Sequence, residues 1–82
     1  MVDEITIDAL GLLCPLPVLR LRKRLLELPA GVMVRILADD PVAVIDIPHY
    51  CQEAGHEFLG AEDHPYDAPE GKSPMCYRLR TR

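Results

Sequence analysis

The chain has 82 residues with 49% hydrophobic side chains, which is enough for one hydrophobic core and too short for two, so we expect one domain over residues 1–82. Its formal net charge of -4 excludes general affinity for nucleic acid, because phosphate contacts require an excess of Lys and Arg. No apolar run approaches the roughly 20 residues that cross a membrane, and the first four residues carry acid where a secretory signal carries base. We therefore expect a cytoplasmic protein that contacts neither nucleic acid nor membrane directly.

The first half of the chain predicts a strand, a helix and a second strand. β-Branched residues recur over Val2–Asp8, as in a short strand. From Pro15 to about Leu28, apolar residues recur at three- and four-residue steps, with Leu19 and Leu26 widening the stripe, which indicates an amphipathic helix. Val32–Ala38 is rich in β-branched residues and lacks helical periodicity, so it predicts a mostly buried central strand.

A second helix is predicted from Pro41 to about Ala54, ending at Gly55. Asp39 or Asp40 can cap its N-terminus, because short polar side chains accept the free N–H groups of a first helical turn. Pro48 removes one internal hydrogen bond, and we expect it to kink or divide this helix.

The last part of the chain predicts two further strands, His56–Leu59 and Met75–Arg80. Prolines and acidic residues between Gly60 and Pro74 are typical of a flexible hairpin connection. The predicted order is therefore βαβαββ. A two-layer α/β (α+β) sandwich, with both helices on one face of a four-stranded mixed sheet, is the simplest way to bury two helical stripes in so short a chain.

The motif that carries a reactive side chain is Cys14-Pro15-Leu16-Pro17. Pro15 and Pro17 fix two φ angles, and Pro15 suits the first helical position, so we expect Cys14 at or next to the helix N-cap. The positive end of the helix dipole then favours the thiolate and lowers the thiol pKa from its usual value of about 8.5. The alternative is that Cys14 is a small apolar residue buried between helix and sheet.

A thiolate that only accepts and passes on a sulfur atom needs few other groups. In agreement, the sequence has no Ser-His-Asp order, no Gly-rich phosphate loop and no Cys-x-x-Cys pair. Arg20 and Lys23 would strengthen the field at Cys14 if either side chain reaches back along the helix. Together with Arg24 they form a basic cluster beside the motif, which suits an acidic protein partner.

The other cysteines have weaker claims to a chemical role. Cys51 has His49 and His56 near it in sequence, but this spacing matches no known zinc cluster, so we expect no metal and no cofactor. A redox pair of Cys51 with Cys14 stays open and requires Cα atoms within about 7 Å. Cys76 is expected to be structural.

Four segments resemble the TusA/SirA-like sulfur carriers: Asp8–Pro17, Ala38–Pro41, Asp46-Ile47-Pro48 and Cys51. The resemblance spans about residues 5 to 59 and continues more weakly to Leu79. It implies a βαβαββ sandwich and a sulfurtransferase that carries a persulfide on Cys14. It also implies a sulfur donor, such as a cysteine desulfurase or a rhodanese-like protein, and an acceptor protein. The pathways it allows are tRNA thiolation, sulfur oxidation and molybdenum cofactor assembly.

The chain departs from the best-known branch of that family beside the thiol. Leu13 and Leu16 stand where that branch has an arginine and an acidic residue, which suggests a donor or acceptor outside the tRNA route. Unimpaired transfer to the tRNA-pathway acceptor would count against this hypothesis. The alternative function is a non-catalytic regulatory or adaptor domain that binds a partner through the basic face of the first helix. Cys14→Ser separates the two, because it abolishes sulfur transfer and spares binding.

Overall fold

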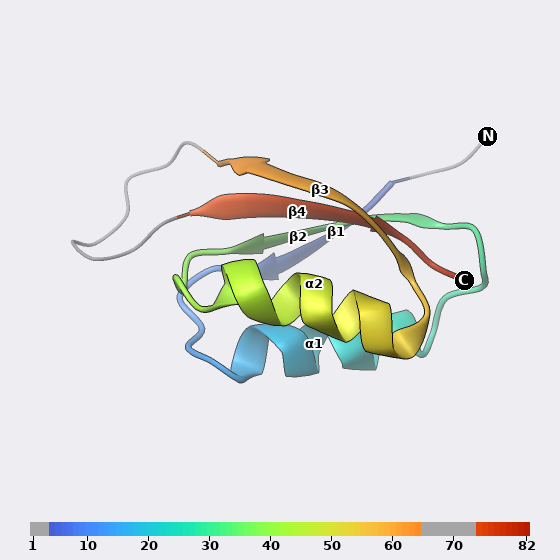
Figure 1. Cartoon of the computed structure of the whole chain (residues 1–82), viewed down its shortest axis with the longest axis horizontal. Helices are drawn as coiled ribbons and strands as arrows, with labels where there is room; N and C mark the ends of the chain where they lie inside the picture. The colour runs from blue at the N-terminus through green and yellow to red at the C-terminus, as the bar shows by residue number, and fades with distance from the viewer. Residues whose placement is uncertain (1–3, 65–73) are drawn as a thin grey trace.

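A computed structural model describes residues 4–64 and 74–82. Its elements in chain order are β1 (Ile5–Ala9), α1 (Leu16–Leu25), β2 (Met33–Ala38), α2 (Ala43–Ala54), β3 (Glu57–Asp63) and β4 (Met75–Arg80). The four strands form one sheet in the order β1-β2-β4-β3. β1 is parallel to β2, and β4 is antiparallel to both of its neighbours. Figure 1 shows α1 and α2 side by side under one face of the sheet, which confirms the predicted two-layer βαβαββ sandwich.

The core lies between the sheet and the two helices. Alternate residues of β2 are buried, because successive side chains of a strand point to opposite faces and α1 and α2 cover one of them. The predicted central strand is therefore confirmed in position, with one face buried and the other partly exposed. The core residues are Ile7, Ala9, Leu21, Leu25, Val34, Ile36, Ala38, Ala43, Ile47, Cys51, Tyr77 and Leu79.

α1 is shorter and its buried face narrower than the periodicity predicts. The helix ends at Leu25, and the N–H groups of Glu27 and Leu28 bond three residues back, at 3.1 and 3.2 Å, in a tightened final turn. Leu19 and Leu26 are 48% and 80% exposed. The prediction that they widen the buried stripe is wrong, because only the side of the helix that carries Leu21 packs against the sheet and α2.

α2 runs without a break through Pro48. The prediction that Pro48 divides it is wrong: a proline removes one intrahelical N–H bond, while Ile47 and Cys51, on either side of it, are fully buried and hold both halves of the helix against the core. The predicted end is confirmed, since Gly55 has φ 82°, a left-handed conformation that favours glycine. The helix begins at Ala43, two residues after the predicted start.

β3 is longer than predicted. The strand continues from Glu57 to Asp63, and its pairing with β4 shifts between Phe58 and Gly60. Such a bulge absorbs an extra residue and lets the strand continue past a glycine that would otherwise signal its end. The connection predicted over Gly60–Pro74 therefore starts too early, and its residues 65–73 lie outside the described part of the chain. β4 matches its predicted bounds.

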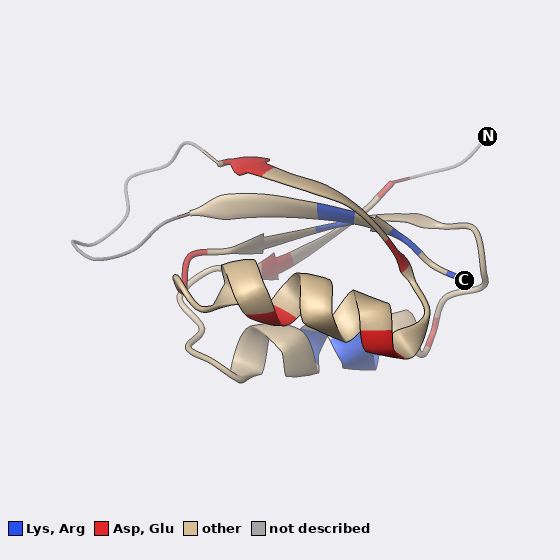
Figure 2. Ribbon diagram, in the orientation of Figure 1, with Lys and Arg blue, Asp and Glu red and all other residues tan. Residues whose placement is uncertain are grey.

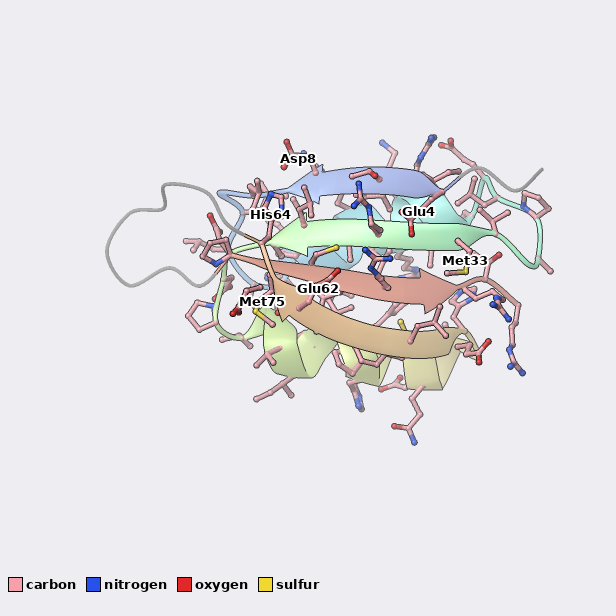
Figure 3. All side chains as sticks on the ribbon, turned by 90° about the horizontal axis from the view of Figure 1, so that it is seen from above. Glu4, Asp8, Met33, Glu62, His64 and Met75 are labelled. Atoms are coloured by element: carbon pink, nitrogen blue, oxygen red, sulfur yellow. The ribbon has the colours of Figure 1, made fainter. Side chains whose placement is uncertain are left out.

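The sheet face that α1 and α2 leave uncovered carries charged side chains. Figure 3 looks onto this face, where Glu4 and Glu62 are labelled. Glu4 pairs with Arg35 at 3.2 Å and with Arg78 at 3.7 Å, and Glu62 pairs with Arg78 at 2.9 Å. Exposed pairs of this kind each stabilise a fold by less than about 1 kcal/mol. Within the described residues, no helix is long and apolar enough to cross a membrane.

Candidate functional site

The parallel pairing of β1 with β2 brings two loops together. Ala9 and Ala38, the last residues of the two strands, are partners in the ladder. Parallel strands end at the same edge of a sheet, so the loop after β1, which holds Cys14, lies beside the loop after β2, which holds Asp39 and Asp40. In open α/β sheets this edge is where binding sites form.

Two carboxylates fasten the loop that carries Cys14. The backbone N–H of Gly11 donates to both side-chain oxygens of Asp39 at 3.1 Å. The N–H of Cys14 donates to Asp40 Oδ2 at 2.5 Å, and the N–H of Val42 donates to Asp40 Oδ1 at 3.2 Å. Asp39 and Asp40 are 1% and 8% exposed, so both act from inside the fold. The backbone around the cysteine is therefore held from the adjacent strand end.

The sequence prediction assigned these two aspartates only to helix capping. Asp40 does accept an N–H at the start of α2, but the same carboxylate also holds Cys14, while Asp39 holds Gly11. The missed role had a signal in the sequence. Once the strand before the motif is placed parallel to the strand before Asp39 and Asp40, their loops must meet.

The two prolines lie at the start of α1 as the motif predicts, but the helix begins one residue later than expected, at Leu16. Pro15 is the N-cap residue and the buried Pro17 is in the first helical turn, where a missing N–H leaves no intrahelical bond unmade. The peptide bond between Cys14 and Pro15 is cis. Cys14 precedes the N-cap and its side chain is exposed. The alternative that Cys14 is a buried core residue is thereby wrong.

The thiol of Cys14 meets a carboxylate. Its Sγ donates to Asp46 Oδ2 at 3.0 Å. This hydrogen bond, together with desolvation and the negative charges of Asp46 and Asp40, raises the pKa of Cys14 above its usual value. The sequence predicted the opposite direction from the dipole of α1. The dipole is a partial charge that weakens beyond the first turn, whereas the full charge of Asp46 is in contact with the sulfur.

A shallow cleft of about 380 Å³ opens beside the thiol, between the start of α1 and one side of α2. Its floor is largely apolar and its α2 wall carries acidic and polar groups. His49 and Glu53, one helical turn apart on that wall, contact each other through His49 Nε2 and the Glu53 carboxylate. The lining residues are Cys14, Pro15, Val18, Asp46, His49, Tyr50 and Glu53.

The basic residues of α1 lie away from the sulfur. Arg20 Nη1 donates to the backbone carbonyl of Asp8 at 2.8 Å, and Arg24 pairs with Glu27 at 3.2 Å. Arg20 and Lys23 border a second shallow surface with Leu12, Leu16 and Leu19. The expectation that Arg20 or Lys23 strengthens the field at Cys14 is wrong, because the electrostatic causes of its pKa shift are carboxylates. Figure 2 shows the basic positions along α1 and the acidic positions on the neighbouring α2.

The other two cysteines are inside the protein. Cys51 is fully buried in α2, and burial raises the pKa of its thiol to about 11. Cys76 is 4% exposed in β4. His56 Nδ1 accepts the backbone N–H of Arg82 at 3.1 Å. Over residues 4–64 and 74–82, no three His, Cys, Asp or Glu side chains are grouped so that they could hold a metal ion.

The βαβαββ sandwich presents one exposed cysteine on a loop fastened at the ends of two parallel strands, which is the arrangement of a small thiol-based protein. Residues 5–68 match the model of the family described as sulfurtransferase TusA. The chain therefore belongs to the TusA family, as the motif resemblance predicted.

Individual relatives agree with this assignment. The chain is 43% identical over 63 residues to the sulfur carrier protein TusA of Pseudomonas entomophila, which covers 77% of this chain and 79% of that protein. It is 41% identical over 56 residues to the protein of the same name from Pseudomonas syringae pv. syringae, covering 68% and 67%. The crystal structure of a SirA-like protein from Desulfitobacterium hafniense superposes with a TM-score of 0.62 at 33% identity, over 90% of this chain and 95% of that one.

Proposed function

We propose that this protein is a sulfur carrier in which Cys14 accepts a sulfane sulfur as a persulfide from a donor protein and passes it to an acceptor protein. The observation that carries the proposal is the contrast among the three thiols. Cys14 is exposed on a loop fastened by Asp39 and Asp40, while Cys51 and Cys76 are buried. A carrier must present its sulfur to two different partners in turn, and only the first of these thiols is presented.

The chemistry requires little beyond that thiol. In loading, Cys14 Sγ attacks the outer sulfur of a donor persulfide, and the donor leaves as a thiol. In unloading, an acceptor thiol attacks the outer sulfur held on Cys14. Pro15 and Pro17 act as positioning residues, because they fix the backbone at the start of α1.

We propose that partners dock on the α1 side of the thiol. Leu13 and Leu16 lie close to Cys14 in sequence and are 58% and 49% exposed. Leu16 borders a shallow surface together with Leu19, and apolar side chains gathered in this way are typical of a partner contact. Arg20, Lys23 and Arg24 continue this surface with positive charge. A partner that presents acidic residues around an apolar contact complements it.

The test is intact-protein mass spectrometry after incubation with a cysteine desulfurase and cysteine, without reductant. The wild type should gain the mass of one sulfur atom, which a reductant removes, and Cys14→Ser should gain none. Rhodanese-type donors supplied with thiosulfate, and polysulfide, extend the test to other sources. A wild type that gains no sulfur from any of them would contradict the proposal.

The exposed apolar and basic surface of α1 also favours a second candidate, a non-catalytic adaptor that binds a partner through that helix. Sulfur transfer measured beside partner binding separates the two functions. An adaptor binds its partner equally well as wild type and as Cys14→Ser and transfers no sulfur in either form, whereas a carrier transfers sulfur as wild type and loses the transfer in that variant.

A further inference from the structure

Asp46 is the acidic group that touches the reacting atom. Its Oδ2 lies 3.0 Å from Cys14 Sγ and accepts a hydrogen bond from the thiol. Asp46 comes from the first turn of α2, which packs beside α1, so the contact joins residues 32 positions apart. The side chain is half-buried and lines the cleft into which the thiol opens. A carboxylate in this place can take a proton from the sulfur without any movement of the backbone.

We propose that Asp46 is a catalytic residue of the carrier: while sulfur is loaded it takes the proton of the Cys14 thiol, and while sulfur is unloaded it passes the proton of the attacking acceptor thiol to Cys14 Sγ as the leaving group. This inference rests on the proposed function. In loading, Cys14–SH and a donor R–S–SH become Cys14–S–SH and R–SH. The bond from Sγ to the sulfane sulfur forms as the S–S bond of the donor breaks, and the proton of Sγ passes through Asp46 to the departing thiolate. No external oxidant or reductant is consumed.

A proton acceptor is needed here because the surroundings of Cys14 favour the protonated thiol. The hydrogen bond to Asp46, desolvation and the charges of Asp46 and Asp40 all raise the pKa of Cys14. The nucleophile in sulfur exchange is the thiolate. The proton must therefore leave during the attack, and a base in hydrogen-bond contact is placed to receive it.

The other titratable groups around the thiol are differently engaged. Asp40 accepts the backbone N–H groups of Cys14 and Val42. His49 Nε2 and the Glu53 carboxylate, further along the cleft wall, contact each other. Desolvation raises the pKa of Tyr50, which also lines the cleft. Among the described residues of the cleft, Asp46 is the one whose side chain accepts a hydrogen bond from Cys14 Sγ.

The proposal predicts opposite changes in two reactions of Asp46→Asn. Alkylation by iodoacetamide releases iodide, which takes up no proton, so its rate follows mainly the thiolate fraction of Cys14. Removing the negative charge lowers the thiol pKa, so alkylation at pH 7.5 should become faster. Persulfide loading from glutathione persulfide should become slower by at least about tenfold, because general bases contribute about 10²–10⁴-fold and water in the open cleft replaces part of that. A change in thiolate fraction alone would speed both reactions.

Glu53→Gln is the matched control, because it removes a carboxylate from the same cleft without removing a hydrogen bond to the sulfur. It should leave both rates within about twofold of the wild type. Asp46→Glu keeps a carboxylate and should recover part of the loading rate. The pH profile of alkylation, recorded from pH 6 to 10, should move to lower pH in Asp46→Asn and stay in place in Glu53→Gln.

Two kinds of result would overturn the proposal, and they separate the role of Asp46 from that of Cys14. Loading by Asp46→Asn at the wild-type rate, or alkylation and loading that change in the same direction, would overturn the role of Asp46 while leaving Cys14 as the carrier. A wild type that is alkylated at Cys14 but takes up no sulfur would overturn the proposed function, and the role of Asp46 with it.

Discussion

Asp40→Ala should destabilise the protein and loosen the loop that carries Cys14. The carboxylate accepts two backbone N–H groups, one from Cys14 at 2.5 Å and one from Val42 at 3.2 Å. A hydrogen bond to a charged group contributes about 1.5–3 kcal/mol. Cys14 and Val42 are exposed, so water can replace part of both bonds, and we expect a total loss of about 2 kcal/mol. That equals the upper end of the cost of losing a helix cap, about 0.5–2 kcal/mol.

Urea denaturation followed by circular dichroism measures this loss directly. A decrease of about 2 kcal/mol corresponds to a melting temperature lower by about 10 °C in a protein of this size. Asp40→Asn keeps one acceptor oxygen and should lose about half as much. Glu53→Ala is the control, because its exposed pair with His49 contributes less than about 1 kcal/mol.

Hydrogen exchange provides the local measurement. The amide of Cys14 should exchange faster in Asp40→Ala, while amides in the centre of β2 should change only as much as the global stability does. An unfolding free energy within about 0.5 kcal/mol of the wild type, together with unchanged exchange at Cys14, would refute the conclusion that Asp40 holds the loop.

Two further predictions follow from the same geometry. Lys23→Glu should slow loading from a protein donor several-fold at low salt, with the difference shrinking as salt is added, and should leave loading from glutathione persulfide unchanged; a salt-independent effect would contradict the docking proposal. Burial raises the pKa of Cys51 to about 11, from about 9 in the unfolded chain. Between these two pH values the thiol ionises in the unfolded state before it ionises in the folded state, so stability is lost as pH rises. Relative to Cys51→Ala, the wild type should lose about 1.4 kcal/mol between pH 8 and 10, and equal slopes for the two proteins would show that the thiol is not buried.

The order of elements was predictable because each depends on local pattern. The amphipathic period of α1, the β-branched run of β2 and the glycine after α2 all act within a few residues. The errors concern elements whose limits depend on neighbours. β3 continues past Gly60 because β4 pairs with it through a bulge, and α2 continues through Pro48 because the core holds both of its halves.

The candidate site was predictable in its nucleophile and incomplete in its surroundings. Cys14 was identified by the prolines beside it, a local signal. The contacts that set its properties join it to Asp40 and Asp46, which are 26 and 32 positions away. They depend on the parallel pairing of β1 with β2 and on the packing of α1 against α2. For that reason the sequence predicted a lowered pKa from the local dipole, whereas the carboxylates raise it.

Mapping the added sulfur to one cysteine tests directly whether Cys14 carries it. The protein is loaded by a cysteine desulfurase with cysteine, alkylated under native conditions, digested and analysed by peptide mass spectrometry. We expect the additional sulfur on the peptide that contains Cys14 and none on those that contain Cys51 or Cys76. Sulfur found on Cys51 or Cys76, or on no cysteine, would contradict the claim.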